Sequence, residues 1–512
     1  MIYPLAFTGA LASLALWFLY RANDTKSKLF QSSFFGALGI YVLSVILADA
    51  SLGTKLGTLF RDFVAMAAFG LAFQLLATNK RWILAGSVMA LAALGWYYEG
   101  YMAHTFSREN TGLPTYDPSG ELLVELAEGS GEEALATVVR KYGLKLERAF
   151  TPAFPDATEL DDYYSIDVPP RYSSRLNEVI RGLQGITAVD WVEPNEMVSV
   201  SPEPARRELP GINKKFGIND PGLAHLWGFE AMEVDRLFDY LDNQNLAPER
   251  KALIAILDTG VDAGHEDIKD NFKSTKPAYD NDPKGHGTHC AGIAAAVSNN
   301  GVGVASFSRD NRFVQVTSIK VLSASGMGSQ RTIIKGILEA ADTGADVISL
   351  SLGGLSNQTK ERAYQKAVEY ANEKGAIVVA AAGNSNRNAK SFAPAGVPGV
   401  IAVSALDEEL NRAVFSNYVT DLDMGIAAPG VNIYSTIPNG NYSSFNGTSM
   451  ATPYVSGLIG LLKSLDPGLD TNTAYEILRK SGKKSKNVKE TGNLIYPLGA
   501  VEELERQKQN PL

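Results

Sequence analysis

The chain has 512 residues, of which 45% are hydrophobic and 20% are charged, so it can build several folded domains and does not have the composition of a disordered protein. Its formal net charge of −9 provides no basic surface of the kind that neutralises phosphates, which argues against nucleic acid as a partner. Cys290 is the single cysteine and cannot form an intramolecular disulfide, so cysteine usage does not indicate whether the protein lies in an oxidising or a reducing compartment.

Four apolar runs occupy the first 100 residues. They are Leu5–Tyr20, Phe34–Ala48, Phe63–Ala77 and Trp82–Tyr98. Each is near the lower limit of about 17 residues for a spanning helix, and four in series predict a four-helix transmembrane domain over residues 1–100. The alternatives are a signal peptide for the first run, which would carry positive charge before it, or buried core helices, which would show polar faces.

The loops between these runs differ in positive charge. Five positive side chains lie in the first and third loops, and only two lie in the second: Arg21, Lys26, Lys28, Lys80 and Arg81 against Lys55 and Arg61. The positive-inside rule then places both termini on the outer face. We therefore expect a multi-pass protein of the cell or inner membrane whose remaining residues lie on the extracytoplasmic side.

Residues 117–200 have the pattern of a small α+β domain. A strand, a helix ending at Gly143 and a strand are followed by the same order of elements up to "VDWVEPN". Two such units suggest a ferredoxin-like sandwich, a fold that by itself indicates no function. Residues 201–218 are polar and rich in proline and basic residues, which is typical of an exposed linker.

Residues 219–505 alternate between short apolar strands and helices, a pattern that predicts a doubly wound, mainly parallel sheet. Five runs have strand character: "ALIAILD", "RFVQVTSIKVL", "ADVISLSLGG", "AIVVAAAGN" and "VIAVSAL". Polar residues at the carboxyl ends of such strands are candidate site residues, and Asp258 and Asn384 hold these places. No strand is followed by a phosphate-binding glycine loop, so a nucleotide enzyme has little support.

Two helix starts carry further candidates. "GHGTHCAG" contains His286, His289 and Cys290, and "NGTSMATPYVSG" contains Ser449. Histidine and thiolate are zinc ligands, but adjacent helical residues point about 100° apart, so His289 and Cys290 cannot easily share one ion. A serine at a helix N-terminus, a histidine and an aspartate are instead the components of an acyl-transfer triad.

The ordered motifs "ILDTGVD", "GHGTHCAG", "SLSLGG", "AAAGN", "AAPGVNIYST" and "NGTSMATP" resemble those of the subtilisin-like serine proteases, the subtilases, over about residues 216–500. The resemblance implies a subtilisin-like fold and a serine endopeptidase in which Asp258 orients His286 and His286 takes the proton of Ser449. It also implies that the side-chain amide of Asn384 donates to the oxyanion. In this interpretation the active site binds no metal ion, and His289 and Cys290 are packing residues.

The resemblance extends to substrates and maturation. It implies an apolar substrate pocket for protein or peptide chains, lined by Gly326, Ser351, Leu352, Gly353, Ala381, Ala382 and Gly383. Subtilases commonly carry a ferredoxin-like propeptide, so residues 117–200 are expected to act as an intramolecular inhibitor, and the linker 201–218 to contain the self-processing site. No cofactor is expected for the chemistry. Whether the protein binds a structural calcium ion is left undecided, because the loop around Asn299 only partly resembles a subtilase calcium loop.

Two other functions remain as alternatives. One is a metal-dependent hydrolase that uses His286, His289 and Cys290, which a chelator would inactivate. The other is a catalytically silent, membrane-anchored binding protein. A serine-directed fluorophosphonate distinguishes both from a serine protease, because only the protease has an activated serine to label.

Overall fold

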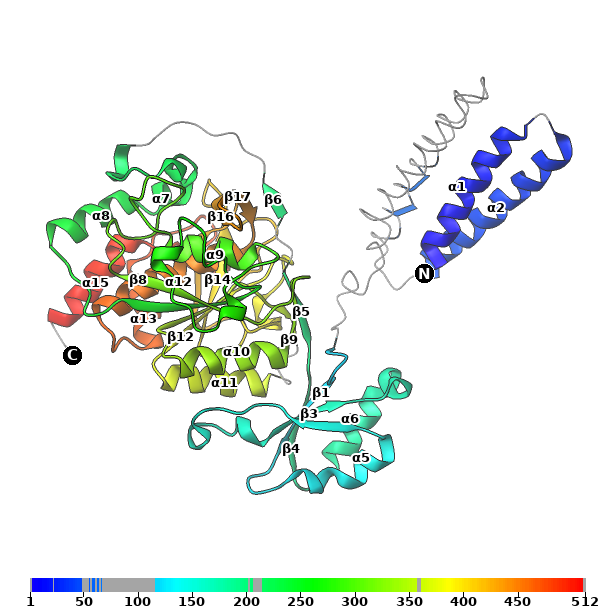
Figure 1. The fold of residues 1–512 in the computed structure, drawn as a ribbon, viewed down its shortest axis with the longest axis horizontal. Coiled ribbons are helices and arrows are strands. Elements are labelled where there is room, and N and C mark those ends of the chain that lie inside the picture. Colours follow the sequence, from blue (N-terminus) through cyan, green and yellow to red (C-terminus); the bar gives the residue numbers. More distant parts are fainter. Residues whose placement is uncertain are drawn as a thin grey trace. The chain divides into compact units, whose positions relative to one another are not determined.

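The computed structural model describes residues 2–21, 23–47, 116–200, 203–205, 214–356 and 361–509, together with six residues between 55 and 66. The chain forms two units, Met1–Thr115 and Tyr116–Leu512 (Figure 1). Of the four apolar runs, the first two fall within the described residues. The fourth run lies outside them, as does all of the third except residues 63 and 66.

The first unit begins with a helical hairpin, α1 (Ile2–Leu19) and α2 (Asp24–Leu47). Phe7 of α1 packs with Tyr41 of α2, at 5.5 Å between ring centroids, and both side chains are buried. Among the described residues only Asp24–Ile46 is long and apolar enough to cross a membrane, since α1 offers the shorter apolar stretch Gly9–Phe18. The described helices thus provide one candidate span, and they do not support the four predicted from hydropathy.

The second unit starts with a four-stranded antiparallel sheet in the order β2-β3-β1-β4. Its elements are β1 (Leu122–Leu126), α5 (Ala136–Tyr142), β2 (Lys145–Arg148), β3 (Tyr163–Asp167), α6 (Leu176–Gln184) and β4 (Val189–Pro194). This element and strand order is that of a ferredoxin-like sandwich. Gly143 ends α5 with φ 68°, as its position in the sequence suggests.

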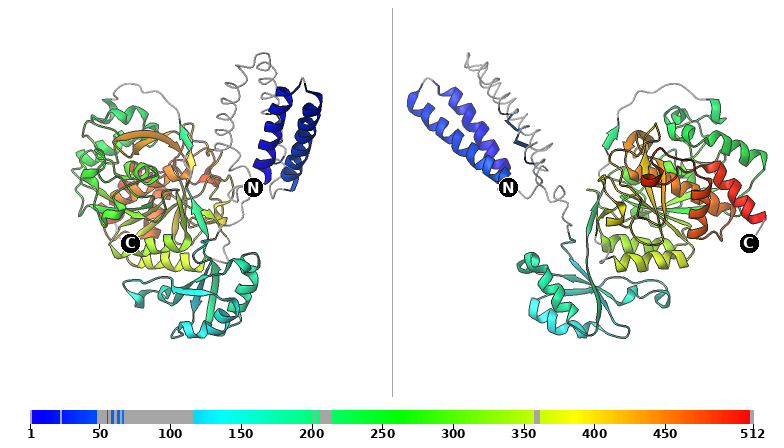
Figure 2. Two further views of the ribbon diagram at one scale, coloured as in Figure 1. Left: turned by 45° about the vertical axis from the view of Figure 1, so that its right-hand side comes forward. Right: turned by 180° about the vertical axis from the view of Figure 1, so that it is seen from behind.

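The side chains of β1 point alternately to the two faces of this small sheet, and apolar residues lie on both faces. Leu122 and Val124 pack under α5 and α6, whereas Leu123 joins a cluster that also contains residues of the larger domain. Because successive strand residues point to opposite faces, one face makes the small domain's own core and the other makes an interface. Figures 1 and 2 show this domain beside α10 (Gln330–Asp342) and α11 (Arg362–Glu373) of the larger domain.

The larger domain is built on a six-stranded parallel sheet in the order β15-β14-β12-β10-β7-β8. The strands are β7 (Ala252–Asp258), β8 (Val314–Lys320), β10 (Val347–Leu350), β12 (Ile377–Ala381), β14 (Val400–Leu406) and β15 (Gly425–Pro429). The first five lie within the runs predicted from the sequence, and β7 and β14 match their runs residue for residue. The predicted α/β fold with a mainly parallel sheet is confirmed.

Helices cover both faces of this sheet. Ile254 and Ile256 face α9 (His286–Ala295) and α12 (Thr448–Leu465), whereas Leu257 faces α10 and α11. The remaining helices are α7 (Trp227–Ala231), α8 (Val234–Asn243), α13 (Thr471–Ser481), α14 (Val488–Thr491) and α15 (Pro497–Gln509). With apolar contacts on both faces, the strands need no polar face, which explains their continuous apolar sequence.

Short strands lie around the sheet's carboxyl edge. They are β5 (Met197–Ser199), β6 (Glu203–Ala205), β9 (Met327–Ser329), β11 (Gly354–Leu355), β13 (Phe392–Ala393), β16 (Ile433–Ile437) and β17 (Asn441–Asn446). β6 falls within the predicted linker, yet it pairs with β17 as the third strand of a small antiparallel sheet. Phe216 and Ile218, at the end of that predicted linker, are buried in the core of the larger domain.

Candidate active site

Asp258 ends β7 and is completely buried beside the first residue of α9. Both of its carboxylate oxygens lie 2.8 Å from Nδ1 of His286, and the backbone N–H of Thr259 donates to Oδ1 at 2.8 Å. A carboxylate held in this way keeps the proton of a neutral imidazole on Nδ1 and leaves Nε2 as the acceptor.

The N-terminus of α9 is fixed by Asp282, a residue that sequence reasoning did not identify. Its Oδ1 accepts from the N–H of Gly285 at 2.9 Å, and its Oδ2 accepts from the N–H of Thr288 at 2.8 Å. The hydroxyl of Thr259 donates to the same carboxylate at 2.7 Å, which links the end of β7 to the start of α9. An aspartate shortly before a helix is a capping signal, so the sequence contained the clue.

Ser449 is the second residue of α12 and is 8% exposed. In this state its hydroxyl donates to the carbonyl oxygen of Ser351 at 2.9 Å, and the hydroxyl of Ser351 donates to the carbonyl oxygen of Ser449 at 2.8 Å. Hydrogen bonds between a nucleophile and its base are often looser before substrate binds. The N-terminus of α12 supplies backbone N–H groups and the positive end of the helix dipole beside Oγ.

Asn384 lies just beyond β12 and reaches the same helix start. Its Oδ1 accepts from both the N–H and the hydroxyl of Thr448, each at 2.9 Å. Its Nδ2 lies 3.3 Å from the place that a Cβ on Gly447 would occupy. With the oxygen fixed by Thr448, the amide nitrogen is presented as a donor beside the N-terminus of α12. Gly383 belongs to the same arrangement, because its N–H donates to the hydroxyl of Thr448 at 3.1 Å.

Of the three residues of the metal alternative, the structure groups His286 with Cys290 but not with His289. His289 is buried against Phe445, 4.3 Å between ring centroids, and its Nε2 lies 3.0 Å from the carbonyl oxygen of Ser443. Burial lowers the pKa of His289 to about 3, so the ring is neutral. Potential ligand atoms of Asp258, His286 and Cys290 do lie within 4.8 Å of one another, but burial raises the pKa of the thiol, which disfavours a thiolate ligand.

The predicted substrate pocket is bordered by a segment of the chain itself. β5 pairs antiparallel with β9, so that Val198 lies opposite Gly328, and the N–H of Val200 donates to the carbonyl oxygen of Gly326 at 3.0 Å. The other side of β5 faces Gly354, where an added Cβ would lie 3.1 Å from Val198. β5 thus lies between β9, next to the predicted pocket residue Gly326, and Gly354, next to the predicted pocket residue Gly353, as an extended peptide substrate would.

Two polar side chains of the small domain accept hydrogen bonds from the N-termini of two helices of the larger domain. The carboxylate of Glu193 accepts from the N–H groups of Arg362 and Ala363 at 2.9 and 3.2 Å, and from Nε2 of Gln330 at 3.0 Å. Asn195 Oδ1 accepts from the N–H of Arg331 at 2.9 Å. These contacts cap α11 and α10. Burial raises the pKa of Glu193 to about 8 in spite of its donors.

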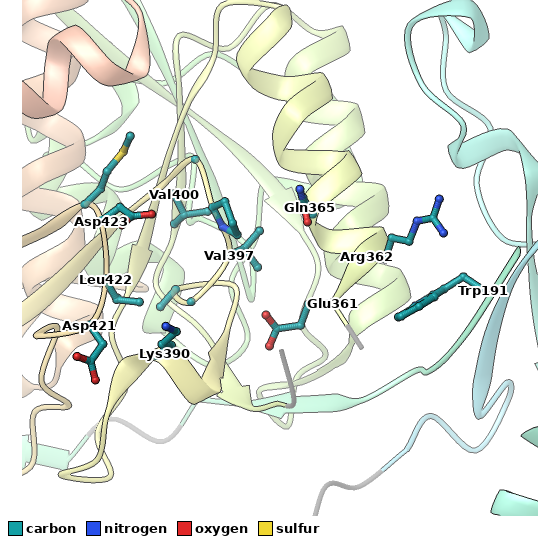
Figure 3. A pocket seen from close by; sticks show the side chains of 15 residues that line it. Trp191, Glu361, Arg362, Gln365, Lys390, Val397, Val400, Asp421, Leu422 and Asp423 are labelled. Atoms are coloured by element: carbon teal, nitrogen blue, oxygen red, sulfur yellow. The ribbon is translucent and has the colours of Figure 1, made fainter. Parts of the chain in front are cut away.

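A hollow of about 500 Å³ lies beside this interface (Figure 3). Trp191 borders it from the small domain, and α11, the loop before β14 and residues 421–424 supply its other walls. Glu361 lines it, and among the described residues its Oε1 has no hydrogen-bond partner. None of Asp258, His286 and Ser449 lines the hollow, so it is separate from the candidate active site.

A second group of buried carboxylates lies near Asn299. Asp220 accepts from the N–H of Asn299 at 2.7 Å, and Asp267 accepts from Nδ2 of Asn300 at 2.9 Å and from the N–H of Val304 at 2.7 Å. Burial raises the pKa of both carboxyl groups, that of Asp267 to about 8. Within the described part of the chain neither forms an ion pair with lysine or arginine. Two buried carboxylates that have no cationic side chain as a partner supply oxygen ligands of the kind that Ca²⁺ prefers.

The larger domain is similar in sequence to known proteins. Residues 249–494 match the subtilase family, Peptidase S8. Thermitase of Thermoactinomyces vulgaris is 45% identical over 252 residues, covering 48% of this chain and 85% of thermitase. Subtilisin DY of Bacillus licheniformis is 42% identical over 226 residues, covering 43% of this chain and 79% of that protein.

A third relative matches over a longer region. The thermophilic serine proteinase of Bacillus sp. strain AK1 is 33% identical over 350 residues, covering 67% of this chain and 78% of the relative. That share is about 343 residues of this chain, more than the 299 residues from Lys214 to Leu512. The likeness therefore includes part of the chain that precedes Lys214.

Proposed function

Because the chain belongs to the subtilase family and is a serine endopeptidase, we propose that Asp258, His286 and Ser449 are its catalytic triad and that Asn384 is its oxyanion donor. The observation that carries the assignment is the pair of 2.8 Å contacts from His286 Nδ1 to a fully buried Asp258, with Ser449 at a helix N-terminus in the same domain.

Each residue has one chemical role. Nε2 of His286 accepts the proton of the Ser449 hydroxyl as Oγ attacks the substrate carbonyl, and Asp258 stabilises the imidazolium that forms. The tetrahedral oxyanion receives hydrogen bonds from Nδ2 of Asn384 and from the helix N-terminus, a contribution of about 10²- to 10³-fold in turnover that has been measured in a subtilisin. His286 then gives its proton to the leaving amine, and water hydrolyses the acyl-enzyme by the same steps.

A fluorophosphonate probe tests the nucleophile directly. We expect the intact protein to form one stable adduct, mapped by mass spectrometry to Ser449, with loss of peptidase activity in proportion to labelling. Labelling should persist after dialysis against a chelator if calcium is restored before the assay. Activity that survives complete labelling but is lost in the chelator and returns with zinc would support the metal-dependent alternative instead.

The substrates are protein or peptide chains bound in extended form. β5 models such a chain, because alternate residues Val198 and Val200 are buried while Ser199 is exposed. Gly326, Ser351–Gly353 and Ala381–Gly383 are proposed as the walls of this cleft. Their lack of charge favours apolar substrate side chains over basic ones.

Residues 117–200 act as a propeptide that inhibits the same molecule and is later removed by self-processing. Three observations support this role: β5 lies in the proposed substrate cleft, Glu193 and Asn195 cap two helices of the protease domain, and the likeness to the Bacillus proteinase extends before Lys214. The processing site is placed in the linker 201–218.

The N-terminal segment is proposed to anchor the precursor in a membrane, with the protease on the extracytoplasmic side. Support comes from α2, on which Phe35, Ile40, Leu43 and Ile46 are each more than half exposed. Such an apolar surface is costly in water and favourable in lipid. The orientation rests on the loop charges, and the number of spans beyond α2 rests on hydropathy alone.

Calcium is proposed as a structural ion, with no part in the chemistry. Asp220 and Asp267 would hold it, and its charge would offset the two buried carboxylates. Asn299, the sequence candidate, contributes its N–H to Asp220 and has φ 59°, so its backbone shapes the loop.

A further inference from the structure

Two of the proposed pocket walls end in glycine, and β13 lies beside both of them. The walls are Ser351–Gly353 and Ala381–Gly383, and β13 consists of Phe392 and Ala393. A Cβ added to Gly353 would lie 3.0 Å from the carbonyl oxygen of Ala393, and one added to Gly383 would lie 3.2 Å from Cδ1 of Phe392. Because β13 also pairs with β11, which directly follows the first wall, it closes the space between the two walls.

The ring of Phe392 is directed toward this space. Ala393 belongs to the apolar cluster that includes residues of α10 and α11, and successive residues of a strand point to opposite faces. Within the described part of the chain, Phe392 is in none of the apolar clusters of the protease domain, although it is only 6% exposed. It does not line the hollow of Figure 3 either. Its ring therefore fills the space in front of Gly383.

Both walls adjoin the proposed reacting groups. The hydroxyl of Ser449 donates to the carbonyl oxygen of Ser351 at 2.9 Å, and Asn384 directly follows Gly383. A side chain that enters between the walls therefore belongs to the substrate residue whose carbonyl Ser449 attacks. The Phe392 ring stands at the inner end of the space that this side chain enters.

We propose that Phe392 forms the floor of a shallow pocket, so that the enzyme cleaves after small apolar residues such as alanine in preference to leucine and phenylalanine. This inference deepens the proposed function and rests on its triad and its pocket walls. A larger side chain would have to displace a closely packed ring or remain outside the pocket. A difference of one methylene group in an apolar pocket changes kcat/KM by about 10- to 200-fold, which sets the expected scale.

The test measures kcat/KM for three peptides that differ only in the residue before the cleaved bond, which is alanine, leucine or phenylalanine. The full chain is incubated until its peptidase activity is constant, and rates are normalised to the fraction of Ser449 labelled by fluorophosphonate. Wild type is compared with Phe392→Ala, which removes the ring, and with Phe392→Leu, which leaves an apolar side chain of intermediate size. Phe272→Ala is the matched control, because Phe272 is a half-buried ring that pairs with β8 at the edge of the sheet.

We expect wild type to have a kcat/KM about tenfold or more higher for the alanine peptide than for the phenylalanine peptide. Phe392→Ala should abolish or reverse this preference, and Phe272→Ala should keep the wild-type ratio even if its total activity falls. Phe392→Leu should lie between them, and its ratio decides the matter if Phe392→Ala does not fold.

Two results would overturn the inference: wild type that cleaves the phenylalanine peptide as well as the alanine peptide, or a ratio that is the same in wild type and in the Phe392 variants. The proposed function fails separately, if no form cleaves any of the peptides and none is labelled by fluorophosphonate.

Discussion

The burial and the hydrogen bonds of Asp258 control the orientation and the tautomer of the His286 ring. The side chain is fully buried, and the imidazole is its partner through both carboxylate oxygens. A buried carboxylate with one such partner fixes the ring's orientation and tautomer, and in the proposed triad it would compensate the positive charge that the ring gains during acyl transfer. We therefore expect these contacts to act on turnover more than on substrate binding.

Asp258→Asn should lower kcat by about 10⁴-fold while KM changes little, because the amide stabilises the wrong tautomer of His286. Steady-state kinetics on a peptide substrate measure this effect, and a thermal melt checks the fold. Asp262→Asn is the matched control, since Asp262 lies four residues further on and contacts backbone N–H groups outside the triad. Equal losses in both variants would contradict the assigned role.

These residues could be proposed from the sequence because each has a recognisable local sequence context. Asp258 ends an apolar strand, and His286 and Ser449 open helices beside glycines. The partners of His289 could not be predicted in this way. Its contacts, Phe445 and the Ser443 carbonyl, come from a strand more than 150 residues later, and no local pattern points to them.

At the scale of elements, the start of α9 depends on Asp282. Asp282→Ala removes the acceptor of three backbone N–H groups, those of Lys284, Gly285 and Thr288, and loss of such a cap costs about 0.5–2 kcal/mol. We expect a lower melting temperature together with reduced kcat, because His286 is the first residue of that helix. The exposed Asp270→Ala serves as the control. Unchanged kcat in Asp282→Ala would show that the cap does not position the base.

The calcium proposal predicts a pH-dependent stability. Without a bound cation, burial raises the pKa of Asp267 to about 8, above the ordinary value near 3.9. The folded state then binds more protons than the unfolded state between these values, so the free energy of unfolding falls as pH rises from about 4 to 8. Calcium should restore the stability lost at pH 8.

Thermal unfolding in a chelator at pH 5 and pH 8 measures this slope, and Asp267→Asn should flatten it. The difference between variant and wild type isolates Asp267 from Glu193, whose pKa is raised in the same direction. A melting temperature at pH 8 that does not respond to calcium would contradict the proposal.

Elements with a strong apolar pattern were predictable, and those defined by backbone pairing were not. β7 and β14 match their predicted runs because both faces of the sheet are covered. β6 was missed because its residues are polar and include a proline, which favours a linker by composition. Its strand conformation depends on the free edge of β17, a tertiary feature that composition does not contain.

At the scale of the whole molecule, maturation should release the protease from its anchor. A cut in the linker separates a membrane-bound piece of about 200 residues from a protease of about 300. Cell fractionation should therefore find the short form in the soluble fraction of wild type, whereas Ser449→Ala should stay full length in the membranes. Active enzyme that remains uncut and wholly membrane-bound would indicate a permanent docking role for residues 117–200.

Hydropathy was a weaker guide at this scale than motifs were. Runs of 15 to 17 apolar residues are close to the length limit for a span, and a small shift in helix bounds changes the outcome. In the structure, α2 extends the second run back to Asp24 and passes the limit, whereas the apolar part of α1 does not. The ferredoxin-like order was easier to predict, because its two halves repeat the same alternation of elements.

Hydrolysis of a casein-type substrate by wild type and Ser449→Ala, each purified as the full chain and matched for folding by thermal melt, tests the triad most directly. The variant removes one oxygen atom at the start of α12. Wild type should gain activity as it matures, and the variant should show no hydrolysis above the uncatalysed rate even after its propeptide is removed by added active enzyme. Turnover by the variant equal to that of wild type would contradict the assignment of Ser449 as the nucleophile.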